Sequence, residues 1–172
     1  GRLDLAFLYG DTPEPSLHKR ALLDERLALV TGPGHTALPK TITLPRVAAH
    51  ALVLPSREHG LRRIIDEACD ATGLSLQVVA EIDSLPNVKR AVAVGIGATI
   101  LPLAAVAEEV AEGRLRAATI TDARMLRRLV LATSANRPST VAATAVQALA
   151  ARLIEQMVRA GAWPGKWVAT GG

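Results

Sequence analysis

Between residues 51 and 102, short apolar segments alternate with segments that have the spacing of amphipathic helices. Residues 51–55 predict a strand that Pro55 ends, and residues 74–82 and 98–101 predict two more strands. The first intervening helix carries one apolar stripe, formed by Leu61, Ile64, Ile65, Ala68, Cys69 and Thr72. This order of elements predicts an α/β fold in which helices flank a parallel or mixed sheet.

The ends of these two helices carry capping residues. Ser56 is expected to cap the first helix with its hydroxyl, and Gly73 to follow its last turn in the left-handed conformation. Asp83 or Ser84 is expected to cap the second helix, with Pro86 in its first turn. The apolar side of the second helix is Val88, Ala91 and Val92.

Further elements are expected on both sides of this region. Residues 3–9 resemble a strand buried on both faces, and residues 17–23 and 26–31 predict two separate strands. Residues 44–50 predict a short helix. Residues 103–112 predict a helix that Gly113 ends.

The last third of the chain predicts two extended segments and a long helix. The extended segments are residues 115–120 and 127–133, and the helix begins near Ser139 and ends at Gly161. A four-residue repeat gives this helix its apolar side, formed by Val141, Ala145, Leu149, Leu153 and Met157. The tail from Ala162 is expected to be irregular.

Composition excludes several classes of protein. The 172 residues are 49% hydrophobic and 21% charged, which fits one folded domain or two small lobes. Aromatic residues are only 2%, which argues against an RNA module that stacks bases. The net charge of +4 is spread along the chain, and its densest parts, Arg62–Arg63 and Arg124–Arg128, are interpreted as solvated surface rather than a nucleic-acid patch.

The cellular setting is inferred from the same composition. The single cysteine excludes a disulfide framework and a Cys-rich metal site, and it favours a reducing compartment. No apolar run reaches about 18 residues, and no basic-then-apolar leader is seen. We therefore expect a cytoplasmic protein without membrane contact. Because the chain has no initiator Met and opens in a strand-like segment, we expect it to be the C-terminal part of something longer.

Motifs for catalysis are not found. The histidines, His18, His35, His50 and His59, lack metal-ligand spacing, and no HExxH, CxxC, GxSxG or Walker motif occurs. Gly95 and Gly97 begin a dinucleotide fingerprint, but Ile100 stands where the third glycine is needed. Cys69, in the middle of a helical stripe, is interpreted as core packing. The sequence thus predicts no catalytic residue, metal or cofactor, and an enzyme that depends on Cys69 or His59 is the less favoured alternative.

Binding residues are better represented. Ser56 offers a hydroxyl at a helix start, where backbone N–H groups accept a carboxylate or other small anion. Arg57 adds a charge, and Asp83 with Ser84 repeats the arrangement. Thr99 supplies another hydroxyl behind two glycines. Alternatively, Ser56 and Ser84 only cap their helices, and His59 is a surface residue of the first turn.

The ordered motifs resemble the effector-binding domain of LysR-type transcriptional regulators. Residues 1–6 resemble the "G-x-LD-x-A" strand, and residues 24–30 with His35 resemble "L-x-x-E-x-L-x-L-V" and "HPL", although Thr36 replaces the proline. Residues 81–84 and 93–102 resemble "E-x-DS … VAAGLGITLLP". Residues 52–62, residues 128–131 and the helix after Ser139 match the remaining family elements. The resemblance extends to about residue 160.

The resemblance implies a fold similar to periplasmic binding protein type 2, with two α/β lobes, mixed sheets and an incomplete first lobe. The first lobe would be residues 1–33 and 125–172, and the second residues 34–124. A small effector, anionic or amino-acid-like, would bind between the lobes. The effector-binding residues implied are Ser56, Arg57, His59, Asp83, Ser84, Gly97 and Thr99.

In the family, the effector changes how N-terminal winged helix-turn-helix domains of a tetramer sit on DNA. The resemblance therefore implies a bacterial transcription regulator that is a homo-oligomer, a dimer or tetramer, when full length, and that contacts DNA only through a domain outside this chain. A periplasmic-type solute-binding protein is the alternative. The upstream sequence distinguishes the two: a helix-turn-helix pattern supports regulation, and a signal peptide supports transport.

Overall fold

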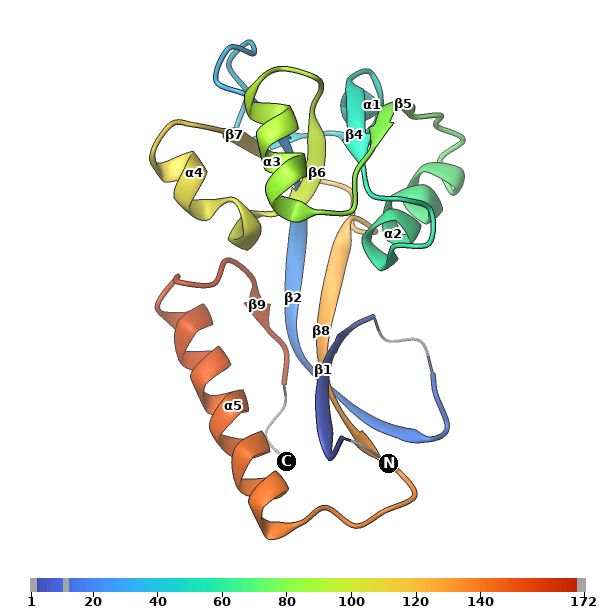
Figure 1. The fold of residues 1–172 in the computed structure, drawn as a ribbon, viewed down its shortest axis with the longest axis vertical. Coiled ribbons are helices and arrows are strands. Elements are labelled where there is room, and N and C mark those ends of the chain that lie inside the picture. Colours follow the sequence, from blue (N-terminus) through green and yellow to red (C-terminus); the bar gives the residue numbers. More distant parts are fainter. Residues whose placement is uncertain (1–2, 11–12, 170–172) are drawn as a thin grey trace. The chain divides into compact units, whose positions relative to one another are not determined.

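The computed structural model describes residues 3–10 and 13–169, and its elements follow the predicted alternation of strands and helices (Figure 1). The strands are β1 (Leu5–Tyr9), β2 (Leu17–Thr31), β3 (Thr41–Ile42), β4 (Ala51–Leu54), β5 (Gln77–Glu81), β6 (Thr99–Pro102), β7 (Arg116–Ile120), β8 (Leu126–Ser134) and β9 (Lys166–Trp167). The helices are α1 (Leu44–Ala48), α2 (Gly60–Asp70), α3 (Leu85–Ala93), the 3-10 helix η1 (Leu103–Ala105), α4 (Ala107–Ala111) and α5 (Val141–Arg159).

The sheets are mixed, as predicted. The larger sheet has the strand order β1-β8-β2-β7-β3, and β6 and β9 also pair with β2. The pairs β1–β8, β2–β6, β2–β7 and β2–β9 are antiparallel, whereas β3 and β7 are parallel. Strands β4 and β5 form a parallel pair, and a parallel bridge from Leu52 to Ala98 connects β4 with the segment before β6.

The chain divides into two compact units. Unit 1 comprises residues 1–25 and 127–172, and unit 2 comprises residues 26–126. The long strand β2 belongs to both units, because it continues through residues 25 and 26. The lobe boundaries predicted from the sequence fall at residues 33/34 and 124/125.

Unit 2 buries the helical faces that the sequence predicts. In α2 the residues Leu61, Ile65, Ala68 and Cys69 are buried, and Ile64 packs against the same core. In α3 the buried residues are Val88, Ala91 and Val92, as predicted. Gly73 has a φ of 66°, as expected for the left-handed residue after α2.

Unit 1 is built around a smaller core, and here the predicted helical face is wrong. The core contains Leu22, Leu23, Leu129 and Leu131, and α5 contributes Ala151 and Ile154. The four-residue repeat is instead exposed: Val141 is 90%, Leu149 47%, Leu153 48% and Met157 43% exposed. A spacing of four residues overshoots the 3.6-residue turn, so it drifts around the helix and cannot define one buried face.

Three other local predictions are wrong. Strand β1 is not buried on both faces, since Phe7 is 42% and Tyr9 48% exposed and its only pairing in the described strands is with β8. Residues 17–31 form one strand rather than two, because Asp24 and Glu25 bind arginines of β8 without interrupting the strand. The helix predicted over residues 103–112 is divided at Val106, where φ is −130°.

The tail after α5 also differs from expectation. Within the tail that is expected to be irregular, Lys166 and Trp167 form β9 against β2.

Among the described helices, α5 alone has the length and mean hydropathy (1.2) of a membrane span, although Gln147, Arg152 and Glu155 interrupt its apolar residues. Only 17% of that span is buried.

Candidate functional site

In unit 2, strands β4 and β5 end side by side, and polar residues follow both. The Ile82 N–H donates to the Leu54 carbonyl oxygen at 2.9 Å, which continues the pairing beyond the strands. Ser56 follows β4, and Asp83 and Ser84 follow β5. Because ligands of open α/β sheets bind beyond the carboxyl ends of parallel strands, this is the first place to look for a site.

Ser56 and Asp83 are in direct contact. The Ser56 N–H donates to Asp83 Oδ1 at 2.9 Å. This bond, followed by a hydrogen bond with the Ser56 side chain, lowers the pKa of the exposed Asp83 carboxyl. Asp83 is therefore a fixed carboxylate at neutral pH, and it holds the segment after β4 against the segment after β5.

His59, rather than Ser56, caps α2. The His59 Nδ1 accepts a hydrogen bond from the Leu61 N–H at 3.1 Å, and α2 begins at Gly60. The prediction that Ser56 caps this helix is wrong because a turn, in which the His59 N–H donates to the Ser56 carbonyl at 3.0 Å, comes between Ser56 and the helix. The N–H of Ser56 itself is occupied by Asp83.

Ser84 lies at the N-cap position of α3 but does not cap it. Its φ and ψ of −81° and 113° are typical of an N-cap, yet its side chain makes no capping hydrogen bond. Pro86 is in the first turn, as predicted. Ser84 is exposed, so its hydroxyl can bind a ligand at the positive end of a nine-residue helix.

The structure thus brings four of the seven predicted residues together: Ser56, His59, Asp83 and Ser84, which we call the Ser56–Asp83 cluster. Arg57 is exposed and lines a different hollow of about 690 Å³ along α2 and β5. Gly97 lies beyond the carboxyl end of α3, and Thr99 is completely buried in β6. The Thr99 hydroxyl has no hydrogen-bond partner in the described part of the chain.

Arg62 is a structural residue, and the prediction that it lies on the solvated surface is wrong. It is 3% exposed, and its guanidinium donates to the Pro55 carbonyl, Glu81 Oε1 and Asp66 Oδ1 at 3.0, 3.0 and 2.9 Å. These bonds connect the end of β4, α2 and β5. Its position within the apolar stripe of α2, with an acidic residue four positions later, is the sequence signal that points to burial.

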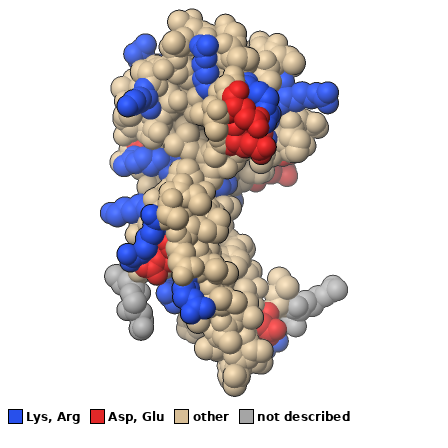
Figure 2. All heavy atoms as spheres, turned by 90° about the vertical axis from the view of Figure 1, so that its left-hand side faces the viewer, with Lys and Arg blue, Asp and Glu red and all other residues tan. Residues whose placement is uncertain are grey.

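The remaining basic residues do not form a patch in the view of Figure 2, where Lys and Arg are scattered over the surface.

Cys69 is buried, which raises the pKa of its thiol and fits the predicted role in core packing. Among residues 3–10 and 13–169, no group of three or more His, Cys, Asp or Glu side chains is arranged to hold a metal ion.

Comparison with protein families decides which family this chain is from. The profile described as "LysR substrate binding domain" matches residues 1–157. The chain belongs to this family. The resemblance in the motifs is therefore confirmed over nearly the whole chain.

Curated relatives of this LysR domain are transcriptional regulators. The HTH-type transcriptional regulator BbuR of Bordetella bronchiseptica is 34% identical over 175 residues, which covers 100% of this chain and 53% of BbuR. The nitrogen assimilation regulatory protein nac of Klebsiella aerogenes is 36% identical over 103 residues, covering 59% of this chain and 33% of nac. The chain spans about half the length of BbuR.

Solved structures share the fold. The Synechocystis PCC6803 CcmR regulatory domain in complex with 2-PG has a TM-score of 0.79 at 20% identity, covering 91% of this chain and 76% of that one. The effector-binding domain of QuiR in complex with shikimate has a TM-score of 0.76 at 22% identity, covering 90% and 73%. The prediction of a fold like that of periplasmic binding proteins is confirmed.

Proposed function

We propose that this LysR domain binds a small metabolite and passes that event to a DNA-binding domain elsewhere in a longer protein. The observation that carries the proposal is the match of the LysR substrate-binding profile to residues 1–157 of a chain with the corresponding fold. In this proposal the two compact units correspond to the two lobes of the family. The regulator is cytoplasmic, acts as a homo-oligomer and makes no membrane contact.

The effector is an amino-acid-like or other small anionic molecule. Ser84 offers an unused hydroxyl at the positive end of α3, which suits a carboxylate. The carboxylate of Asp83 repels a simple anion but attracts an ammonium group. The Ser56–Asp83 cluster therefore favours a ligand that carries both charges. Arg57, Gly97 and Thr99 are kept as further candidate contacts. The ligands in the titles of related structures, 2-PG and shikimate, are also small molecules.

No bond is made or broken in this mechanism, and no metal or cofactor is needed. A ligand that binds one conformation of the domain better than another shifts the balance between them. A coupling of roughly 1–3 kcal/mol is enough to regulate DNA binding. The named relatives are regulators, which supports a sensing role rather than catalysis.

A thermal-shift screen of small carboxylates and amino acids tests this proposal. At a concentration of about 100 times Kd, a ligand adds roughly 2.7 kcal/mol to the stability and raises the Tm. Asp83→Asn keeps an oxygen for the Ser56 N–H but removes the charge, and Ser84→Ala removes the free hydroxyl. Both variants are expected to fold normally and to give a clearly smaller shift, because binding that is about ten times weaker leaves about half of the stabilisation at the same concentration.

The control is Glu155→Gln, an exposed change on α5 that should keep the full shift. A panel in which no compound raises the Tm contradicts the proposed sensing function. A shift that neither Asp83→Asn nor Ser84→Ala reduces contradicts the role of the Ser56–Asp83 cluster but not the sensing function.

A further inference from the structure

A second hollow lies in unit 2, at the other ends of the elements that carry the Ser56–Asp83 cluster. It has a volume of about 440 Å³, and its lining includes Ala51 at the start of β4 and Ala93 at the end of α3. The Ser56–Asp83 cluster follows the end of β4 and precedes the start of α3. Since α3 has nine residues, roughly 13 Å of helix separates the two places.

Thr31 contributes a buried hydroxyl to this hollow. It is the last residue of β2 and is 1% exposed, and it lines the hollow. Its Oγ1 has no hydrogen-bond partner among the residues that the structure describes. A buried polar group without a hydrogen-bond partner costs free energy, so a ligand oxygen that bonds to this hydroxyl would be stabilising.

Two histidines line the same hollow. The ring centroids of His35 and His50 are 5.2 Å apart and the rings are tilted by 43°. His35 Nδ1 is 3.1 Å from the Thr36 carbonyl oxygen, which accepts its proton and leaves Nε2 as the other ring nitrogen. Burial, followed by the charges of His35 and Arg46, lowers the pKa of His50. His50 can present an N–H to a ligand oxygen in either protonation state, whereas His35 can donate from Nε2 only when its ring is protonated.

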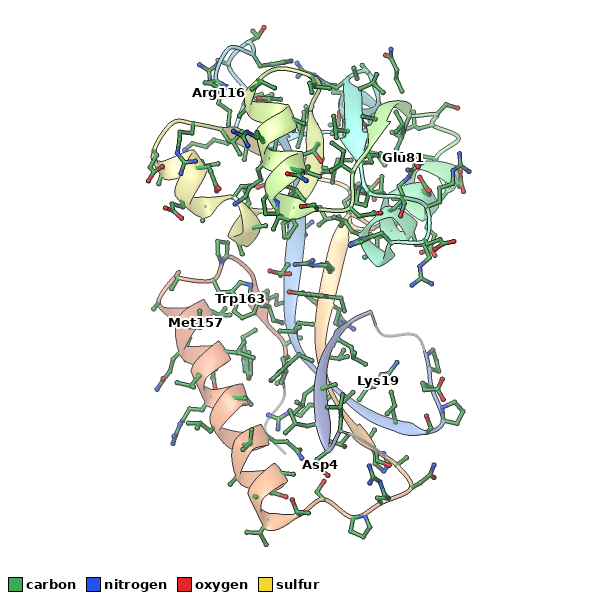
Figure 3. All side chains as sticks on the ribbon, viewed as in Figure 1. Asp4, Lys19, Glu81, Arg116, Met157 and Trp163 are labelled. Carbon is green, nitrogen blue, oxygen red and sulfur yellow. The ribbon has the colours of Figure 1, made fainter. Side chains whose placement is uncertain are left out.

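Two arginines lie next to the histidines of this hollow. Arg116, labelled in Figure 3 at the start of β7, donates from Nη1 to the His35 carbonyl oxygen at 2.6 Å. Arg46 lies close enough to His50 to affect its ionisation. Of the residues that the structure describes, no Asp or Glu lines the hollow. A positive surrounding with hydroxyl and imidazole donors is complementary to a negatively charged oxygen.

We infer that this hollow is a second binding site, for a small carboxylate, whose oxygens accept hydrogen bonds from Thr31, His35 and His50. The site is separate from the Ser56–Asp83 cluster and does not depend on the function proposed for that cluster. Gly97, which we predicted from the sequence to contact the effector, lines this second site instead of lying in that cluster.

Nuclear magnetic resonance of the histidine ring protons tests the inference with sodium acetate as the probe. At constant pH and ionic strength, acetate is expected to move the His35 and His50 signals in a saturable manner, whereas the signal of His18 stays unchanged. Sodium chloride controls for ionic strength. Inorganic phosphate distinguishes a carboxylate site from a general oxyanion site, and acetate is expected to bind more tightly.

The matched variant is Thr31→Val, which removes the hydroxyl but keeps the shape of the side chain. It is expected to weaken acetate binding roughly ten- to hundredfold, the value of one hydrogen bond to a charged group, without lowering the Tm of the free protein. His50→Gln is expected to weaken binding similarly, and His18→Gln, at an exposed position on β2, serves as the control that leaves it unchanged.

Three results would overturn the inference. The first is a response to acetate that is not saturable or does not exceed that to chloride. The second is tighter binding of phosphate than of acetate, which would mean a site for another class of anion. The third is acetate binding that Thr31→Val leaves unchanged, which would mean that only water meets the buried hydroxyl.

Discussion

At the residue scale, a buried carboxylate on β2 ties three segments of unit 1 together. Glu25 is 1% exposed, and its Oε2 accepts two hydrogen bonds from Arg127 at 2.9 and 2.7 Å. Its Oε1 accepts a hydrogen bond at 2.6 Å from Trp163, labelled in Figure 3 between α5 and β9. The Arg127 guanidinium lies 3.5 Å from the centre of the Tyr9 ring. The Glu25 carboxylate thus holds the side chains of Arg127 and Trp163 in place.

Glu25→Gln is expected to destabilise the protein by about 3 kcal/mol, because it leaves the largely buried Arg127 without a counter-charge. Urea unfolding measures the change. The control is Glu155→Gln, which removes an exposed pair with Arg159 and should cost no more than about 0.5 kcal/mol. Equal effects of the two substitutions would show that the buried pair contributes no more than a surface pair.

Asp122 makes stability depend on pH in acid. Hydrogen bonds from the Arg124 side chain, and then from its backbone N–H, lower the pKa of Asp122 from 3.8 to about 2. A lowered pKa in the folded state means that the stabilisation is complete above about pH 4 and is lost as the pH falls through 2. In urea unfolding, the gap between wild type and Asp122→Asn should therefore narrow from neutral pH towards about pH 2. A constant gap would contradict this.

Single residues were predictable where their surroundings follow from a local pattern. Cys69 was predicted to be in the core because the stripe of α2 contains it, and it is buried. The pairing of Arg127 was not predicted, since its carboxylate partner Glu25 lies 102 residues away in the sequence. Long-range pairs of this kind have no local signal.

At the element scale, the segment between α3 and β6 packs closely against β4. A Cβ atom on Gly97 would lie 2.7 Å from the Ala51 carbonyl oxygen and 3.4 Å from Val53 Cγ2. The Val53 N–H and the Ala51 carbonyl are both hydrogen-bonded to Ala98, so this part of the backbone cannot move freely. Gly97 is therefore needed for packing, whatever it also contributes to binding.

Gly97→Ala is expected to cost about 1–3 kcal/mol, because the added methyl group displaces hydrogen-bonded backbone. A shift of the urea midpoint without a change in slope would report it. Gly34→Ala is the matched control, because a Cβ there meets nothing within 4 Å and its φ is not positive. If Gly97→Ala is as harmless as Gly34→Ala, the close approach is not a constraint.

Helices and strands were predictable where their apolar periodicity is strong. The end of an element was predictable where a single residue determines it. The stripe of α2 and the glycine after it were both predicted correctly. The start of α2 was not, because a turn that Asp83 holds through the Ser56 N–H precedes it. The buried face of α5 was also missed, since its three buried residues, Ala143, Ala151 and Ile154, are outnumbered by exposed apolar ones.

At the scale of the whole molecule, two compact units share one long strand, and the chain belongs to the family of LysR substrate-binding domains. The fold class followed from the order of strands and helices together with the family motifs, and the family profile and solved relatives confirm it. The candidate site was only partly predictable. The polar residues that follow β4 and β5 are visible in the sequence, but the hydrogen bond that joins Ser56 to Asp83, 27 residues apart, is not.

The most direct test of a domain that binds without reacting is calorimetric titration with a compound that raises the Tm, followed by NMR of the recovered compound. Saturable binding at one site in the micromolar to millimolar range is expected, with the compound recovered unchanged after long incubation. Asp83→Asn should weaken this binding at least about tenfold, the value of one charge-assisted contact. Conversion of the compound into a product, at a rate proportional to protein concentration, would contradict a purely sensing role.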